Sequence, residues 1–335
     1  MNDEHFMRRA LALAENGRYS VSPNPMVGCV IVRDGEVVAE GWHRRAGEAH
    51  AEIEALRGGA DAKGATMYVT LEPCAHQGRT PPCVDAVIDA GVGRVVIAMS
   101  DPHEVVDGRG IARLRAAGIE VSAGVLESEA RRLNEVFVWS VTQKLPFVVL
   151  KAGMTLDGKL ATVTRESQWI TSEAAREASL RLREEHDAIL VGGGTVAADN
   201  PRLTRRLGLG NAMSGWTRVV LDKDRKVPAH AHVLTDGGKT KHITDDADLE
   251  QLLRDLYAEG IRSLIVEGGA LVHAEFIRRR LWQKMVLFVA PMIVGGGEAP
   301  SIFSGEAVTR LTEAYRFRFD RAEFVGGDLM ITAYP

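Results

Sequence analysis

Cysteine is scarce in this sequence, and long apolar segments are missing from it. Only 3 of the 335 residues are cysteine, which argues against a disulfide framework and rules out a metal cage built from four thiolates. No segment approaches the roughly 20 consecutive apolar residues that a transmembrane helix needs. The first 17 residues form an amphipathic helical pattern without the apolar centre of an export signal. We therefore expect a cytoplasmic protein that does not enter a membrane.

Positive charge and aromatic side chains are also in short supply. The formal net charge is -4 and aromatic residues make up 6% of the sequence, whereas surfaces that bind nucleic acid are normally basic and often carry stacking aromatics. The composition thus argues against a nucleic-acid partner. A length of 335 residues is typical of about two domains, each able to bury a core of its own.

Residues that can bind a metal are concentrated between positions 47 and 83. His50 and Glu52 lie two positions apart, and Cys74 and Cys83 each follow a proline. A catalytic zinc ion keeps three protein ligands and leaves one position for water, and one histidine with two cysteines provides such a set. Two thiolates offset the charge of the metal, so a nearby carboxylate has to take the proton of the water, and Glu52 is the candidate. The pattern is typical of zinc deaminases, with iron as the main alternative metal.

The first half of the chain alternates strand and helix patterns. Asp34-Gly35 between two apolar segments predicts a β-hairpin, and Cys29 within the first of these segments is interpreted as a buried structural residue. Cys83 opens a predicted helix, whose positive end favours a thiolate at that position. The alternation predicts a sheet between helices, with the metal site at strand ends. Further helices are expected over 50–56, 84–90 and 127–142, and strands over 65–71, 94–99 and 119–122.

The second half alternates in the same way, and a domain boundary is predicted near residues 143–146. Residues 192–195 (Gly-Gly-Gly-Thr) and 267–269 (Glu-Gly-Gly) each follow an apolar strand. Glycines at strand ends allow a backbone to approach a phosphate closely. Taken singly, however, a glycine segment of this kind is more often an ordinary turn without a ligand. Strands are expected over 147–153, 187–192, 217–222, 240–244, 262–267, 284–291 and 321–333, and helices over 172–184, 247–258 and 270–280.

Three segments of the first half, SPNPMVGCVIV, GWHRRAGEAHAE and TLEPCAHQGRTPPC, resemble the N-terminal domain of the bifunctional riboflavin-biosynthesis deaminase/reductase family. The eight residues between the two cysteines, which depart from the two of the general deaminase pattern, match that family's version. The resemblance implies a cytidine-deaminase-like three-layer α/β/α domain over residues 1–145. It also implies that His50, Cys74 and Cys83 hold zinc, that Glu52 shuttles protons, and that a phosphoribosyl-pyrimidine substrate contacts Asn24, His43, His76 and Asp101.

Segments of the second half, among them LKAGMTLDGKLA, AILVGGGTVAADNPRLTRR and IVEGGALVHA, resemble the reductase domain of the same family. The resemblance implies a dihydrofolate-reductase-like α/β domain over residues 146–335, with Lys151 close to the reacting sugar. NADPH is then expected to contact Gly153, Trp169, Thr195, Asp199, Gly269, Ala270, Leu271, Val272, His273 and Ala274. The substrate is expected to contact Ser167, Arg183, Leu203, Arg206 and Glu267. Guanidinium groups such as those of Arg183 and Arg206 suit a phosphate.

The implied function is hydrolytic deamination of 2,5-diamino-6-(5-phosphoribosylamino)pyrimidin-4-one, followed by NADPH-dependent reduction of its ribosyl group to ribityl. A homo-oligomer, either a dimer or a tetramer, is expected. Three alternatives stay open at this point. They are a nucleic-acid base deaminase with an accessory domain, a zinc-stabilised nucleotide-binding module without turnover, and a deaminase whose second half serves only for dimerisation.

Overall fold

The computed structural model describes residues 2–59, 61–76, 81–103, 108–209, 215–305 and 307–335. The chain divides into two compact units, residues 1–144 and 145–335, and each is described by itself. None of the helices in these described ranges combines the length and the apolar character required to cross a bilayer.

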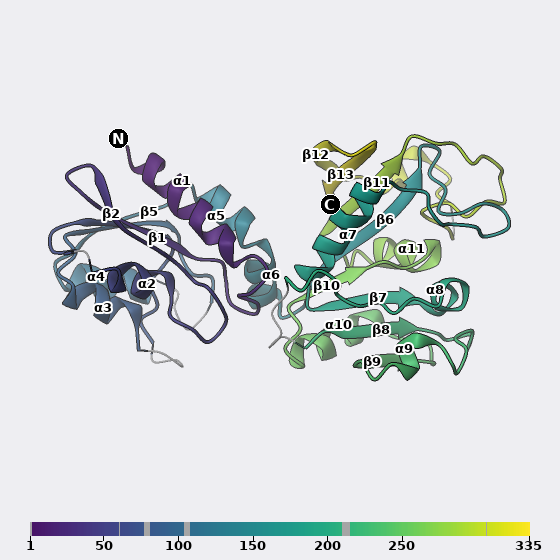
Figure 1. Ribbon diagram of the computed structural model, residues 1–335, viewed down its shortest axis with the longest axis horizontal. Coiled ribbons are helices and arrows are strands. Elements are labelled where there is room, and N and C mark those ends of the chain that lie inside the picture. The colour runs from purple at the N-terminus through teal and green to yellow at the C-terminus, as the bar shows by residue number, and fades with distance from the viewer. Residues whose placement is uncertain (1, 60, 77–80, 104–107, 210–214, 306) are drawn as a thin grey trace. The chain divides into compact units, whose positions relative to one another are not determined.

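The first unit is a five-stranded sheet with helices on both faces (Figure 1). Its strand order is β2-β1-β3-β4-β5, with β1 antiparallel to β2 and β3, and β3, β4 and β5 parallel to one another. Helices α1 and α5 cover one face, and α2, α3 and α4 cover the other. The expected three-layer arrangement is confirmed.

The strands are β1 (Gly28–Arg33), β2 (Glu36–Trp42), β3 (Thr66–Leu71), β4 (Arg94–Met99) and β5 (Glu120–Ala123). The helices are α1 (Asp3–Ala14), α2 (Ala51–Arg57), α3 (Cys83–Asp89), α4 (Arg109–Ala116), α5 (Glu127–Leu133) and α6 (Glu135–Gln143), with a short 3-10 turn, η1 (Glu15–Gly17).

Two glycine-containing positions explain local features of this unit. The hairpin between β1 and β2 turns at Asp34 and Gly35, which both have a positive φ (52° and 81°), as a two-residue turn of the type favoured in hairpins requires. At Gly28 the backbone of α1 approaches so closely that a Cβ would lie 2.0 Å from the carbonyl oxygen of Ala10. Helix α1 can therefore pack directly on β1 only because residue 28 has no side chain.

The single helix predicted over residues 127–142 is wrong, because it is interrupted at Asn134. The Asn134 side chain is buried and binds the backbone of Met26 twice: it accepts from the Met26 N–H at 2.8 Å and donates to the Met26 carbonyl at 2.9 Å. The break thus places an amide side chain where it can hold the proline-flanked segment that contains Asn24.

The second unit contains an eight-stranded sheet in the order β12-β13-β11-β6-β10-β7-β8-β9. All neighbouring strands are parallel except β13, which is antiparallel to both β11 and β12. The strands are β6 (Phe147–Thr155), β7 (Ala188–Gly192), β8 (Thr217–Leu221), β9 (Thr240–Ile243), β10 (Ser263–Val266), β11 (Lys284–Ala290), β12 (Arg318–Val325) and β13 (Asp328–Tyr334). The helices are α7 (Glu173–Glu184), α8 (Gly193–Asp199), α9 (His232–Thr235), α10 (Leu249–Ala258) and α11 (Ala270–Arg278), with a 3-10 turn, η2 (Leu311–Glu313).

Alternation along the parallel strands gives this unit two apolar layers. Leu190 and Val266 belong to a core shared with α10 and α11, whereas their neighbours Ile189 and Ile265 belong to a core shared with α7, α8 and α9. Burial on both faces explains why these strands are continuously apolar in the sequence. One strand predicted over 321–333 is in fact a hairpin, β12–β13, that turns at Gly326 with a φ of 61°. The short helices α8 and α9 were not among the predicted elements.

Two candidate active sites

The first candidate site lies where three elements of the first unit meet. His50 is the residue that precedes helix α2, Cys74 follows strand β3, and Cys83 is the first residue of helix α3. Their ligand atoms all lie within 4.8 Å of one another. The His50 Nδ1 atom is 3.2 Å from the Cys83 Sγ and 3.6 Å from the Cys74 Sγ. One imidazole and two sulfur ligands at this spacing fit a zinc ion.

The two thiols of this site differ in their affinity for a proton. A hydrogen bond with Cys83 lowers the pKa of Cys74, and the same contact, together with burial, raises the pKa of Cys83. The N-terminus of α3 also acts on Cys74. The Cys83 backbone N–H donates to the Cys74 sulfur at 3.3 Å, so the first amide of α3 stabilises negative charge on Cys74. Zinc binding requires both thiols to be deprotonated.

Glu52 lies in the first turn of α2 and is buried beside the three ligands. Burial raises the pKa of its carboxyl group, and the charge of His50 opposes that change. Residues two apart project about 200° apart in a regular helix, but His50 stands just before the helix in an extended conformation. That placement lets both side chains reach the same site, as the sequence requires if Glu52 is to exchange protons there.

The four residues expected to contact the pyrimidine lie near these ligands in different ways. His43 is buried, and its Nε2 is 3.0 Å from the Asn24 amide nitrogen while its Nδ1 is 3.0 Å from the Ala49 carbonyl. A carbonyl only accepts, so Nδ1 carries the proton and Nε2 accepts from Asn24. Burial lowers the pKa of His43, in agreement with a neutral ring, and that ring stands edge-on to His50 at 5.3 Å between centroids.

Asp101 is buried at the end of β4, and His76 is exposed. Burial raises the pKa of Asp101 to about 6, while a hydrogen bond from the His103 N–H opposes this change and the charge of Glu72 adds to it. The charge of His76 acts on the same carboxylate. These two residues are therefore electrostatic neighbours, although the sequence places them 25 positions apart.

Glu72 is a residue whose contribution the sequence did not reveal. It is buried, and its carboxylate accepts hydrogen bonds from the backbone N–H groups of Asp101, Gly108 and Ile111 at 3.1 to 3.3 Å. A Cβ at Gly110 would lie 2.1 Å from the Pro73 carbonyl oxygen, so α4 begins in direct contact with the cysteine-bearing segment. The only sequence signal for this role is a glutamate immediately before Pro73-Cys74.

The second candidate site lies at the carboxyl ends of the parallel strands in the second unit. Lys151 is on β6, and Glu267 directly follows β10. These two strands are paired in parallel, and Leu150 and Val266, the residues just before Lys151 and Glu267, lie opposite each other. The Lys151 Nζ is 3.4 Å from the Glu267 carboxylate. Arg183 of α7 donates to the same carboxylate through Nε at 2.7 Å and Nη2 at 2.9 Å.

This cluster is shielded from solvent, since the side chains of Lys151, Arg183 and Glu267 are only 16%, 15% and 10% exposed. Burial raises the pKa of Glu267, but the charges of Arg183 and Lys151 outweigh burial and lower it to about 2. Two cations around one carboxylate leave a net positive charge. Because the fork of Arg183 is directed at Glu267, the side chain is oriented by this ion pair and does not present its full fork to a phosphate.

The two glycine turns lie against each other at this edge of the sheet. A Cβ at Gly192 would meet the Val272 side chain at 3.0 Å, and a Cβ at Gly269 would lie 3.7 Å from the Thr195 hydroxyl. The N-termini of α8 and α11 are therefore neighbours, and both follow parallel strands. Free backbone N–H groups at such termini suit an anionic ligand.

The other residues of the predicted nucleotide and substrate sets differ in their exposure and contacts. Leu271 is 70% exposed, whereas His273 is buried with its Nε2 3.3 Å from the Val266 carbonyl. Gly153 is on β6, next to Thr171. Trp169 is 66% exposed and lies under the Arg176 guanidinium at 4.5 Å. Asp199 and Arg206 are exposed, and Ser167 is partly buried. Leu203 is buried and has a φ of 51°. Ala270, Val272 and Ala274 belong to α11.

Known families match both halves of the chain. Residues 1–99 match the family described as the cytidine and deoxycytidylate deaminase zinc-binding region. Residues 146–331 match the family described as the RibD C-terminal domain. The first match includes all three metal-ligand candidates, and the second includes Lys151, Arg183 and Glu267.

Relatives of full length are also found. The riboflavin biosynthesis protein RibD of Bacillus amyloliquefaciens is 41% identical over 99% of this chain and 96% of its own length. The protein of the same name from Escherichia coli is 40% identical over 99% of both chains. Among solved structures, a diaminohydroxyphosphoribosylaminopyrimidine deaminase/5-amino-6-(5-phosphoribosylamino)uracil reductase from Thermotoga maritima is 38% identical with a TM-score of 0.89, covering 99% of this chain and 98% of that one. Acinetobacter baumannii RibD is 35% identical with the same TM-score and the same coverage.

These similarities favour none of the three alternatives that the sequence left open. They extend over both halves, which disfavours a second half that serves only for dimerisation and a module without turnover. A nucleic-acid base deaminase is not favoured either, because the relatives are enzymes of riboflavin biosynthesis that act on a small pyrimidine. A zinc ion is implied for the first half, a nicotinamide cofactor for the second, and a small pyrimidine for the substrate. This chain belongs to the RibD family, and it is a bifunctional deaminase and reductase of riboflavin biosynthesis.

Proposed function

We propose that this protein deaminates 2,5-diamino-6-(5-phosphoribosylamino)pyrimidin-4-one in residues 1–145 and then reduces the ribosyl group of the product to ribityl, with NADPH, in residues 146–335. The observation that carries the proposal is the convergence of His50, Cys74 and Cys83 beside the buried Glu52. The name of the Thermotoga maritima relative, which specifies both reactions, supports the same substrates.

In the deamination, His50, Cys74 and Cys83 would hold the zinc ion. When bound, zinc acts as a Lewis acid that makes water a better nucleophile near neutral pH. Glu52 would accept a proton from the attacking water and return it to the departing amine. Its burial supports this assignment, because a raised carboxyl pKa brings the group nearer to the pH at which it can both accept and donate a proton.

The pyrimidine and its sugar would be oriented by Asn24, His43, His76 and Asp101. Neutral His43 fixes the Asn24 side chain, which leaves the amide oxygen of Asn24 as the group that can face the substrate. The carboxylate of Asp101 would accept hydrogen bonds from sugar hydroxyls. This assignment is supported by the position of His43 beside His50 and of Asp101 near Cys74. The oxygen atoms of Asn24 and Asp101 are also suitable hydrogen-bond acceptors.

In the reduction, a nicotinamide cofactor would, when bound, supply the hydride that reduces the first carbon of the opened sugar. Lys151 would hold a proton next to that carbon, because its ammonium group is kept in place by Glu267. The dinucleotide would contact Gly153, Trp169, Thr195, Asp199 and residues 269–274, with its phosphates at the paired helix N-termini. Ser167, Arg183, Leu203, Arg206 and Glu267 would surround the substrate.

The experiment that tests this proposal follows ammonia release and cofactor oxidation in one solution of the purified full chain with the diaminopyrimidine ribosyl-phosphate. We expect ammonia first and NADPH oxidation second, with NADH a poorer donor. A chelator should abolish both signals, and adding the deaminated pyrimidine should restore only oxidation. Ammonia without oxidation would refute the reductase assignment, and oxidation of the diamino substrate without ammonia would refute the order of the steps.

The oligomeric state stays a prediction. We expect a homo-oligomer, a dimer or a tetramer, since symmetric association is common among soluble enzymes. Light scattering of the purified chain would determine its mass in solution.

A further inference from the structure

The connection between α8 and β8 carries two of the proposed substrate residues, Leu203 and Arg206. We call residues 200–207 the substrate loop, and side chains outside this range hold its backbone. The Arg202 carbonyl accepts from Arg218 at 2.9 Å, and the Leu203 carbonyl accepts from the Trp216 indole N–H at 2.6 Å. The Arg206 and Leu207 N–H groups donate to the buried Glu184 carboxylate at 3.1 and 2.9 Å.

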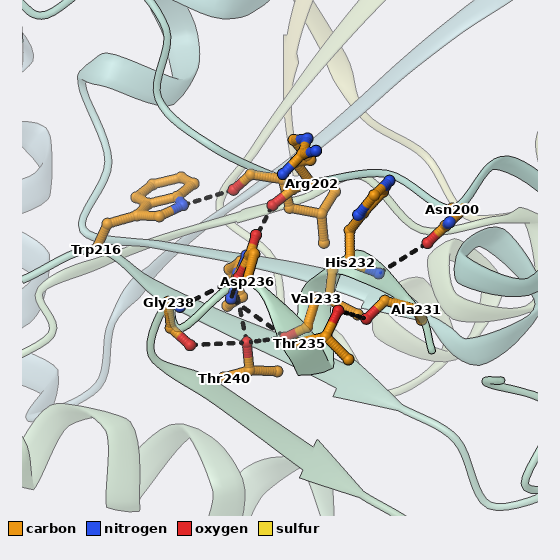
Figure 2. A network of polar contacts seen from close by, with 12 residues as sticks. Asn200, Arg202, Trp216, Ala231, His232, Val233, Thr235, Asp236, Gly238 and Thr240 are labelled. Carbon is orange, nitrogen blue, oxygen red and sulfur yellow. Dashed lines mark hydrogen bonds and ion pairs between the residues drawn. The ribbon is translucent and has the colours of Figure 1, made fainter. Parts of the chain in front are cut away.

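Arg218 is the central residue of this arrangement, and Figure 2 labels its partners Arg202, Val233, Asp236 and Thr240. Its side chain rises from β8 and is 2% exposed, although arginine is rarely buried without partners. The Nε atom donates to the Thr240 hydroxyl at 2.9 Å, and Nη1 donates both to the Arg202 carbonyl and to Asp236 at 2.8 Å. Nη2 donates to Asp236 at 2.7 Å and to the Val233 carbonyl at 3.2 Å. Every N–H of the guanidinium is thus used.

Asp236 fixes the orientation of this guanidinium. Its carboxylate binds both terminal nitrogens, and this hydrogen bonding lowers the pKa of Asp236 well below the usual range. Gly238 closes the other side, because a Cβ there would lie 2.5 Å from the Arg218 Nη2. Held in this way, the planar guanidinium directs one of its N–H groups at the Arg202 carbonyl.

Two side chains of the substrate loop itself add further contacts. The Arg205 side chain donates to the His186 carbonyl and lies over the Trp216 ring at 4.8 Å. Asn200 accepts from the His232 N–H at 2.9 Å. The loop, in which Leu203 has a positive φ, is thus held by the side chains of Glu184, Trp216 and Arg218. Its own Asn200 and Arg205 side chains bind the backbone of α9 and of His186.

We infer that Arg218, held by Asp236, is a positioning residue of the reductase, and that with Trp216 it fixes the substrate loop so that Leu203 and Arg206 can bind the phosphoribosyl-pyrimidine. This inference rests on the proposed function, which places these two residues at the substrate. Fixing a loop before the substrate arrives removes part of the ordering cost of binding. Loosening it is expected to weaken substrate binding more than it slows hydride transfer.

The test measures reductase KM and kcat with the deaminated pyrimidine at saturating NADPH for Trp216→Phe and Arg218→Lys. Trp216→Phe keeps an aromatic ring under Arg205 and removes only the donor to Leu203. We expect KM to rise about 2- to 10-fold, which corresponds to the loss of one hydrogen bond. We expect kcat to change less than about twofold. Arg218→Lys, which cannot form the fork, should raise KM further.

Gln283→Met is the matched control. Gln283 accepts from the Val148 N–H at 2.8 Å, so this variant also removes one side-chain bond to the backbone of the same unit, but far from the substrate loop in the sequence. Its KM should stay within about twofold of the wild-type value, and ammonia release should be unchanged in all variants. Equal KM values in wild type, Trp216→Phe and Arg218→Lys would overturn the inference, as would a fall of kcat alone. Failure of the wild-type chain to oxidise NADPH would instead refute the proposed function.

Discussion

The Glu267 carboxylate accepts two hydrogen bonds from the Arg183 guanidinium, at 2.7 and 2.9 Å. Both side chains are largely buried, so Arg183 would be an uncompensated charge without Glu267. Lys151 adds a second cation on the same carboxylate. The reductase half therefore depends on a three-residue charge cluster whose members come from α7, β6 and the end of β10.

The stability of this cluster should depend on pH. The pKa of Glu267 is lowered to about 2 from 4.5, so its contribution to the free energy of unfolding, about 3 kcal/mol, is complete above pH 4.5 and is lost as the pH falls towards 2. Glu267→Gln should therefore be strongly destabilised at pH 6, with a difference from wild type that narrows at pH 3. Urea unfolding at both pH values measures this. Glu177→Gln, which removes an exposed pair with Arg181, is the control, and an unchanged difference between the two pH values would contradict the assignment.

Replacing Arg183 by lysine should impair the reductase alone. Lysine keeps the charge but cannot make two parallel bonds to Glu267, so Lys151 and the carboxylate would lose their fixed orientation. We expect kcat/KM for NADPH oxidation to fall about 10- to 100-fold, with ammonia release unaffected. Arg181→Lys, two residues earlier on α7 and exposed, should have no effect on either rate. An equal fall of kcat/KM in both variants would show that the two parallel hydrogen bonds from Arg183 to Glu267 are not required for the reductase.

The zinc content should distinguish the three cysteines. Cys74→Ser and Cys83→Ser each remove one of the three ligand candidates, and the bound zinc measured by atomic absorption should fall from about one ion per chain to well below half. Cys29→Ala provides the control, because Cys29 is buried in β1 and belongs to the apolar core. Full zinc in Cys74→Ser would contradict the ligand set.

Glu72→Gln should weaken substrate binding in the deaminase. Its carboxylate accepts three backbone N–H groups around Asp101 and the start of α4, and an amide has only one acceptor oxygen. We expect KM for the diaminopyrimidine to rise about 5- to 10-fold, as for the loss of about one hydrogen bond. Steady-state ammonia release measures this, and NADPH oxidation on the deaminated pyrimidine is the internal control. A KM equal to that of wild type would show that Glu72 is not needed to position Asp101.

Local patterns predicted the features that local chemistry determines. Asp34-Gly35 indicated the hairpin, and the apolar strands gave the two sheets. His50, Cys74 and Cys83 could be grouped because metal binding restricts which residue types occur together, and the structure brings their ligand atoms within 4.8 Å. The roles of the individual contact residues stay predictions until they are measured.

Contacts between distant positions could not be predicted. Arg218 lies in an ordinary strand pattern, and its partners Arg202 and Asp236 are 16 and 18 residues away with no motif that links them. The helix break at Asn134 depends on Met26, which lies 108 positions earlier. In both cases a buried polar group forms hydrogen bonds with residues that are distant in the sequence. A pattern with a period of two or 3.6 residues indicates strands and helices, but it does not indicate such long-range partners.

The central claim, two separate active sites acting in series, is tested most directly with Glu52→Gln and Lys151→Met in the coupled assay. Glu52→Gln should lose about 100- to 10,000-fold in ammonia release, the usual contribution of a proton-transferring group, yet oxidise NADPH normally with the deaminated pyrimidine. Lys151→Met should show the reverse. Glu54→Gln, on the same helix α2, is the control.

An equal mixture of the two variants should then convert the diaminopyrimidine through both steps, because each variant supplies the site that the other lacks. That result would establish two independent sites on one chain. Ammonia release at the wild-type rate from Glu52→Gln, or loss of both reactions in either variant while its fold is intact, would contradict the account.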